Sequence, residues 1–344
     1  MRYIGSKKNL LSEIDSTILP FKKTKKYSSF CDLFSGTAVV AQYFKKDFQV
    51  ISNDLLYFSY VFQKAVIENN YEPKFIKFIK EFGKDPLTYL SEINEKKFKL
   101  IEDPFIHDNY SPTKKCDRKY LSNENALLID IYRQLINLWK KQKLINENEF
   151  FYLVAAVVQS VPYISNIAGT YGAFLKHWDH RSANRLTLRK FDITSNGKDN
   201  KSYNEDSNEL IKKINGDILY IDPPYNHRQY SSNYHLLETI ARYDKPEVKG
   251  VTGVRNDKNL FSRFSSVPKV HGAFSDLIEK ANFKVIVISY SNEGLMKEDE
   301  IADILEKNGK KSSLKIKTIP YRRYKRTNED IKHNLNELLF TIQK

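Results

Sequence analysis

Cysteine is scarce in this sequence. The 344 residues include only Cys31 and Cys116, and these two lack the paired spacing of a zinc site or of a redox-active dithiol. Their scarcity excludes a disulfide-stapled secreted fold and fits a reduced compartment. We identify no cluster of metal ligands and expect no metal cofactor.

Long apolar runs are also missing. The longest run, residues 150–158, has nine residues, whereas a helix that crosses a bilayer needs about 20. Residues 1–8, MRYIGSKK, contain no apolar segment of the kind found in signal peptides. We therefore expect a cytoplasmic protein, in the bacterial cytosol or associated with the nucleoid, with no membrane partner.

Acidic residues are outnumbered by basic ones. Lysine and arginine total 56 against 42 aspartate and glutamate, so the net charge is +14. Such an excess indicates a polyanionic partner, above all nucleic acid. Residues 321–326, YRRYKR, interleave aromatic rings with arginine, which favours contact with nucleic acid. The excess could also consist of scattered lysines on solvated faces.

Strand-like and helix-like segments alternate near the N-terminus. Residues 28–34 and 48–54 are typical of buried strands, and each precedes a helical pattern, at 39–46 and 55–68. This rhythm is typical of a parallel α/β sheet. Further strands are predicted at 217–221, 283–290, 313–324 and 337–343. Residues 70–125 are polar and proline-rich, and one clear helix follows at 124–142. This change of pattern predicts a sheet domain that is interrupted by an insertion.

The glycine-poor turn DLFSGTA, residues 32–38, follows the first strand. Gly36 has no Cβ, so the backbone there can approach a ligand closely. Asp54 ends the next strand, at a spacing that suits an acid accepting hydrogen bonds from ribose hydroxyls. Together the two features favour a nucleoside cofactor. The turn lacks Gly-x-Gly-x-x-Gly, which disfavours a dinucleotide oxidoreductase without excluding it.

The stretch DILYIDPPYN, residues 217–226, is an apolar strand that stops at an acid. Pro223 and Pro224 cannot continue a strand, because proline has no N–H to donate. Asp222 and the Pro223 carbonyl can both accept hydrogen bonds from one exocyclic amino group, and Tyr225 offers a ring for a base to stack upon. The pattern predicts a pocket that holds an amino-bearing base.

These motifs, with RYIGSKK at the N-terminus, resemble those of the Dam-like, alpha-group N6-adenine DNA methyltransferases. The resemblance implies a Rossmann-like α/β sheet, mostly parallel with an antiparallel C-terminal strand, plus an inserted, largely helical target-recognition region. It divides the chain into a cofactor-binding part (1–66), the insertion (67–165) and a second catalytic part (166–344). One departure is Ala38, which stands where that family usually has a second glycine.

The resemblance also implies roles for particular residues, with S-adenosylmethionine as cofactor. The expected catalytic residues are Asp222, Pro223, Pro224 and Tyr225. The expected cofactor-binding residues are Tyr3, Gly5, Lys7, Asp32, Phe34, Gly36, Asp54 and Asp206. The expected DNA-binding residues are Lys176, Arg181, Arg228, Tyr230, Arg322 and Arg323. Arg228 and Tyr230 could equally belong to an ordinary solvated loop.

The implied substrate is double-stranded DNA, with a restriction-modification role and a cognate restriction endonuclease as a further partner. Three alternatives stay open. The same pocket could methylate N4 of cytosine or a base in RNA. The chain could instead be an NAD-type oxidoreductase, or a DNA-binding protein without catalysis.

Overall fold

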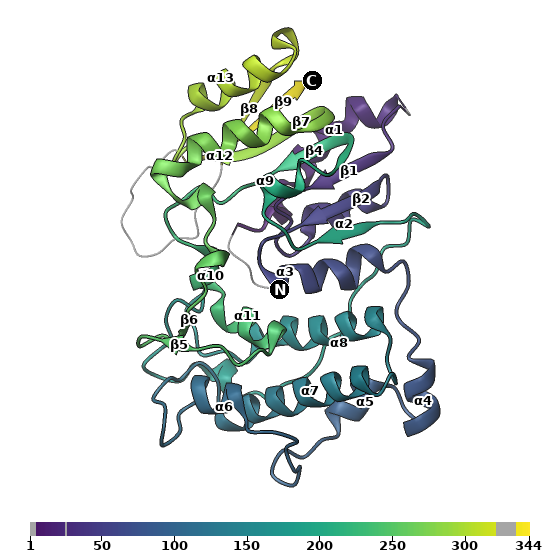
Figure 1. Ribbon diagram of the computed structural model, residues 1–344, viewed down its shortest axis with the longest axis vertical. Coiled ribbons are helices and arrows are strands. Elements are labelled where there is room, and N and C mark those ends of the chain that lie inside the picture. The colour runs from purple at the N-terminus through teal and green to yellow at the C-terminus, as the bar shows by residue number, and fades with distance from the viewer. Residues whose placement is uncertain (1–4, 25, 321–334) are drawn as a thin grey trace. The chain divides into compact units, whose positions relative to one another are not determined.

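The computed structural model describes residues 5–24, 26–320 and 335–344. Two compact units make up the chain (Figure 1). The sheet unit consists of Lys7–Leu55, Lys198–Tyr230 and Phe261–Lys344. The helical unit consists of Leu56–Gly197 and Ser231–Leu260, with the residues before Lys7. The predicted boundaries at 66 and 166 differ from these, because α3 and the segment 231–260 pack with the helices.

The sheet unit contains seven strands in the order β3-β2-β1-β4-β7-β9-β8. The first five are parallel, and β9 runs antiparallel to both of its neighbours, as the resemblance implied. The strands are β1 (Ser29–Asp32), β2 (Gln49–Asn53), β3 (Lys201–Tyr203), β4 (Asn215–Ile221), β7 (Asn282–Ser291), β8 (Lys315–Pro320) and β9 (Asn336–Gln343). The predicted α/β class is confirmed, and β3 is a strand that the sequence patterns did not indicate.

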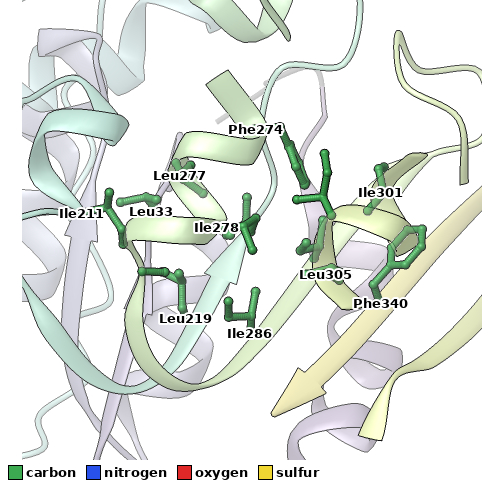
Figure 2. Close-up of a cluster of buried hydrophobic side chains, with 14 of the residues drawn as sticks. Leu33, Ile211, Leu219, Phe274, Leu277, Ile278, Ile286, Ile301, Leu305 and Phe340 are labelled. Carbon is green, nitrogen blue, oxygen red and sulfur yellow. The ribbon is translucent and has the colours of Figure 1, made fainter. Parts of the chain in front are cut away.

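Helices cover both faces of this sheet. They are α1 (Leu11–Lys23), α2 (Val39–Lys45), α9 (Ser207–Leu210), α12 (Val267–Lys280) and α13 (Glu298–Asn308). Alternate residues of each strand enter opposite cores, because side chains in a strand point to opposite faces. Ile218 of β4 packs with Phe44 of α2, whereas Leu219 packs with Leu277 of α12. Figure 2 shows part of the core that contains Leu219 and Leu277.

Asp217 fastens β4 to the start of β1. One oxygen of its carboxylate accepts the backbone N–H groups of Ser28 and Ser29 at 2.7 and 3.0 Å. The other oxygen lies 2.6 Å from the ammonium of Lys284 on β7. Burial alone would raise the pKa of Asp217, but these partners lower it to about 2. The carboxylate therefore stabilises the sheet in its charged form.

The helical unit is built on two long helices, α7 (Asn123–Lys141) and α8 (Glu147–Ser160). Its other elements are α3 (Tyr57–Gln63), a π-helical turn (Lys64–Glu68), α4 (Ile76–Phe82), α5 (Pro86–Ser91), α6 (Phe105–Tyr110), α11 (His235–Arg242) and the hairpin of β5 (Val248–Lys249) and β6 (Val254–Arg255). The short helix α10 (Tyr230–Asn233) contains the point where the chain leaves the sheet unit. In the part of the chain that the structure describes, no helix is long and apolar enough to cross a membrane.

Buried charges in this unit bind the ends of neighbouring helices. Asp130 of α7 accepts the first N–H groups of α6, including that of Ile106 at 2.9 Å. Glu238 of α11 accepts the N–H groups of Tyr57 and Phe58 at 3.0 and 2.9 Å. Arg133 of α7 donates to the carbonyls of residues 240 and 241. The backbone N–H and C=O groups at helix ends have no partner inside the helix. These charged side chains therefore supply hydrogen bonds to buried backbone groups that would otherwise lack them.

Candidate active site

The predicted cofactor and catalytic acids lie at one edge of the sheet. Strands β2, β1 and β4 are adjacent and parallel, and Asp32 is in register with Ser52 on one side and Tyr220 on the other. Asp54 and Asp222 follow the last residues of β2 and β4. The carboxyl ends of parallel strands are where open α/β sheets bind ligands. This edge is therefore the candidate active site.

The turn after β1 is held in place by Asp32, which is 1% exposed. Its Oδ2 accepts hydrogen bonds from the Ser35 hydroxyl and from the backbone N–H of Ala41, both at 3.1 Å. Burial raises the pKa of Asp32 to about 7, against the opposing effect of the Ser35 hydrogen bond. This residue supports the turn, and a direct contact with the cofactor stays a prediction.

Gly36 and Ala38 both adopt left-handed backbone conformations, with φ of 51° and 60°. The Gly36 N–H donates to Asp54 Oδ2 at 2.9 Å, which joins the turn to the end of β2. An alanine in this conformation costs roughly 1–2 kcal/mol. Ala38 nevertheless takes a backbone conformation that glycine adopts readily, so the departure from the family pattern leaves the turn intact.

Asparagines that the motif analysis missed connect the neighbouring strand ends. Asn53, 1% exposed, donates to the carbonyls of Leu33 and Glu205 at 3.2 and 3.1 Å. Asn204 donates to the carbonyls of Asp54 and Leu55 at 2.8 and 2.9 Å. These bonds fix the loops at the ends of β1, β2 and β3, which places the Asp54 backbone. The direct adjacency of Asn53 and Asp54 was the available signal.

The Asp222 carboxylate pairs with a buried lysine. Its Oδ1 lies 2.8 Å from Lys7 Nζ, and the same ammonium lies 3.2 Å from Glu337 Oε1 on β9. Lys7 begins the 3-10 helix Lys7–Leu10 and is 5% exposed. Ser289 of β7 donates its hydroxyl to the same Glu337 oxygen. Lys7 and Asp222 were predicted site residues, whereas Glu337 and Ser289 were not.

Burial and charge act in opposite directions on this cluster. Burial raises the pKa of Asp222 above its ordinary value, Lys7 opposes that rise, and Glu337 adds to it. Burial alone would lower the pKa of Lys7, but the charges of Asp222 and Glu337 raise it well above its usual range. The lysine is therefore an ammonium at neutral pH, shared by two acidic groups.

The Tyr225 ring is fixed beside this cluster. It meets the ring of Tyr290 edge to face at 5.9 Å between centroids, and Lys7 Nζ lies 5.5 Å from its centroid. Its backbone carbonyl accepts the N–H of Leu295 at 3.0 Å. The rigid Pro-Pro turn and these contacts give the ring a defined orientation, which suits a stacking surface.

Two other predicted cofactor residues have structural partners. The Phe34 ring packs edge to face on Phe264 at 5.0 Å. Asp206 accepts the N–H of Asn208 at the start of α9 and pairs with Arg263, each at 2.9 Å. Contact with the adenine of a cofactor therefore stays a prediction for Asp206. Gly5, with φ of 81°, belongs to the helical unit, and Tyr3 lies outside the described residues.

The predicted DNA-binding residues fall into separate groups. Arg228 is exposed after the Pro-Pro turn, and Tyr230 begins α10. In the helical unit Lys176 is exposed, whereas the Arg181 nitrogens Nε and Nη2 both bind Asp179, at 2.8 and 2.7 Å. Arg322 and Arg323 lie outside the described residues. Lys176 is therefore better placed than Arg181 to meet a phosphate.

Arg118, which lies in the insertion, fixes a hairpin of the helical unit. Arg118 donates to the carbonyls of Asn109, Gly250 and Val251 at 2.9, 2.9 and 3.0 Å. These bonds fix the tip of the β5–β6 hairpin, where Val251 is 81% exposed. Sequence patterns gave no signal for this hairpin, because each of its strands has two residues.

Fold and sequence together define an α/β protein with a mostly parallel sheet, in which an Asp-Pro-Pro-Tyr turn follows β4. The family of D12 class N6 adenine-specific DNA methyltransferases matches residues 3–304. The chain belongs to this family, which confirms the resemblance drawn from its motifs.

Several curated proteins are similar to the chain. Type II methyltransferase M.FokI of Planomicrobium okeanokoites is 52% identical over 344 residues, covering 100% of this chain and 53% of that protein. Modification methylase StsI of Streptococcus sanguinis is 47% identical over 346 residues, covering 100% and 52%. Type II methyltransferase M.NlaIII of Neisseria lactamica is 37% identical over 329 residues, covering 94% and 92%. The chain thus spans about half the length of the first two relatives.

Proposed function

We propose that the protein transfers a methyl group from S-adenosylmethionine to N6 of an adenine flipped out of double-stranded DNA. The observation that carries this proposal is the position of Asp222, a mostly buried carboxylate at the end of β4 beside the glycine turn of β1. Family membership supports both the chemistry and the substrate.

The chain's residues suit this cofactor. The Asp54 carboxylate is of the kind that accepts ribose hydroxyls, and the left-handed turn at Gly36 allows close approach of the backbone. When bound, S-adenosylmethionine supplies an activated methyl group, so the protein has to position and stabilise rather than activate it.

The pocket residues act on the target amine. Adenine N6 is a poor nucleophile, because its lone pair is delocalised into the ring. Asp222 and the Pro223 carbonyl would accept its two N–H hydrogens, orienting the nitrogen and stabilising the positive charge that develops on it. Tyr225 would stack on the flipped base, whose extrusion costs a few kcal/mol. Positioning the amine in line with the methyl group contributes the remaining acceleration of methyl transfer.

DNA binding and biological role are the broadest parts of the proposal. The net charge of +14 suits phosphate contact, and the insertion, with Lys176 and the Arg118-braced hairpin, is the proposed target-recognition region. The printed names of the relatives describe type II methyltransferases and modification methylases. We therefore propose a restriction-modification role in the cytoplasm, with a cognate endonuclease as partner.

Methyl transfer from labelled S-adenosylmethionine to duplex DNA tests the proposal, followed by single-nucleotide sequencing of modified bases. N6-methyladenine in a short motif is expected. N4-methylcytosine, or labelling of RNA alone, would establish the alternative chemistries. A rise in melting temperature with NAD but not with S-adenosylhomocysteine would overturn the assignment in favour of an oxidoreductase. DNA binding without any transfer would indicate a non-catalytic protein.

A further inference from the structure

Glu337 is an acidic residue of the site that no motif predicted. It lies at the start of β9 and is 5% exposed. Because β9 is antiparallel to β7, this amino-terminal end lies beside the carboxyl end of β7, with Glu337 in register with Ser291. Its Oε1 lies 3.2 Å from Lys7 Nζ and accepts the hydroxyl of Ser289. Glu337 and Asp222 are thus two buried acidic side chains that share one ammonium, although burial of a charge is costly.

We propose that Glu337 is a positioning residue for methyl transfer, which holds Lys7 when the target amine binds Asp222 and keeps the pocket negatively charged. The proposal rests on the proposed function, since it concerns the same amine. The observation behind it is that the Lys7 ammonium contacts two carboxylates, with Nζ 2.8 Å from Asp222 Oδ1 and 3.2 Å from Glu337 Oε1.

The first consequence is a release of Asp222. The amino group of adenine would have to share the Asp222 carboxylate with Lys7, which contacts its Oδ1 in the absence of substrate. Moving a buried ammonium away from its partner is costly when it is left unpaired. Glu337, already bonded to Lys7 and oriented by Ser289, receives the ammonium without leaving it unpaired. The base can therefore enter without expelling a charge into an apolar interior.

The second consequence concerns charge. Two carboxylates and one ammonium leave one net negative charge beside the target amine. Methyl transfer moves positive charge from the sulfonium of the cofactor to N6, and this negative charge favours that movement. The two bonds to Lys7 place the Asp222 and Glu337 oxygens at most about 6 Å apart. An amine bonded to Asp222 at about 3 Å therefore lies at most about 9 Å from Glu337. At an effective dielectric constant of about 20, a unit charge at about 6–9 Å acting on roughly half a developing charge changes the rate about five- to tenfold.

The test is Glu337→Gln in the full chain. The amide oxygen of the substituted side chain can still accept from Lys7 and Ser289, so the packing is kept while the charge is lost. We expect the single-turnover rate of DNA methylation to fall about five- to tenfold, with the affinities for S-adenosylmethionine and DNA within about twofold. Glu279→Gln removes an exposed acid of α12 and is the matched control. It should leave the rate unchanged.

The pH profile separates this role from a structural one. Glu337 raises the pKa of Asp222, so the Glu337→Gln variant should move the acidic limb of the rate to lower pH, even though its plateau is lower. The groups that face Asp222 and Lys7 are Asp32, Tyr220, Tyr225 and Glu337. Apart from Glu337, both proteins share these groups, so the difference between the two profiles isolates its charge.

Two results would overturn the inference. One is a Glu337→Gln variant with the parent's rate and acidic limb. The other is a variant that folds but loses cofactor binding in proportion to its rate. If Glu337→Gln does not fold, Ser289→Ala decides, because it removes only the hydroxyl that orients Glu337. That variant should lower the rate with affinities kept, and a parental rate would refute the role. A parent chain that transfers no methyl group would instead refute the proposed function.

Discussion

Replacing Asp222 removes the acceptor on which the proposed chemistry depends. In Asp222→Ala the target amine loses the carboxylate that stabilises its developing charge. Loss of one preorganised partner of this kind costs about 3–4 kcal/mol, or roughly 100- to 1,000-fold in rate. Asp222→Asn keeps the shape and one acceptor but loses the charge, so we expect a smaller loss in the same direction.

The fold should survive this substitution, for a reason visible in the site. Removing one member of a buried ion pair typically costs about 3–5 kcal/mol, because the remaining charge is left without compensation. Lys7 would keep Glu337 as a partner, 3.2 Å from its ammonium. Burial already raises the pKa of Asp222, so its charged form is costly in the folded chain. The free energy of unfolding should therefore fall by well under that amount.

Single-turnover methylation with saturating S-adenosylmethionine measures the rate, and thermal unfolding with and without S-adenosylhomocysteine measures stability and cofactor binding. Fluorescence of 2-aminopurine at the target position reports base flipping, which should persist in Asp222→Ala and fail in Tyr225→Ala. Tyr225→Phe keeps the ring and should keep most activity. Methylation by Asp222→Ala within a few-fold of the parent would show that the Pro-Pro turn is structural.

Three further substitutions test other parts of the structure. Asp54→Ala should weaken S-adenosylmethionine binding in calorimetry while DNA binding without cofactor is kept; equal loss of both would indicate a collapsed sheet edge. Asp217→Asn should lower the free energy of unfolding by about 2 kcal/mol at neutral pH, since each pKa unit corresponds to about 1.4 kcal/mol. The pKa of Asp217 is lowered to about 2 from 3.8, so its stabilisation is present above pH 3.8 and disappears as pH falls towards 2. Chemical denaturation across that range should show the two proteins converge. Lys176→Ala should reduce the slope of log affinity against log salt by about 1, whereas Arg181→Ala, whose guanidinium is held by Asp179, should change the slope less; an equal change in both would contradict this distinction.

The expected site acids could be placed at one edge of the sheet from the sequence, because open parallel sheets bind ligands at the carboxyl ends of their strands. Strands β1, β2 and β4 were predicted from apolar runs, and the ends of β2 and β4 directed attention to Asp54 and Asp222, whereas Asp32 followed from the family resemblance. The same rule misses Glu337. It lies at the amino end of its strand, and only the antiparallel direction of β9 brings it to the site. Strand direction is a tertiary property, which residue patterns near Glu337 do not encode.

The two compact units divide the chain at more points than the expected segments do. After the Pro-Pro turn the chain leaves the sheet unit, and α11 packs with α3 and α8 before the chain returns at Phe261. The sequence signals for this excursion are weak, because α11 has only eight residues. Glutamate is a residue type typical of solvated helix faces, yet Glu238 of α11 is 0% exposed. Burial of a charge depends on a partner distant in sequence, here the N-terminus of α3.

The buried acids of the two units differ in the partners that compensate their charges. In the helical unit two buried acids are matched by groups that stay in place: Asp130 by the N–H groups of α6 and the Tyr243 hydroxyl, Glu238 by α3 and Arg242. At the sheet edge Asp222 has Lys7, which Glu337 also binds. A shared ammonium leaves a negative charge that an incoming amine can compensate. Burial alone therefore does not distinguish Asp222, the proposed catalytic acid, because Asp130 is at least as buried. The distinguishing feature of Asp222 is that its ammonium partner also contacts Glu337, and the proposed role of Glu337 follows from this difference.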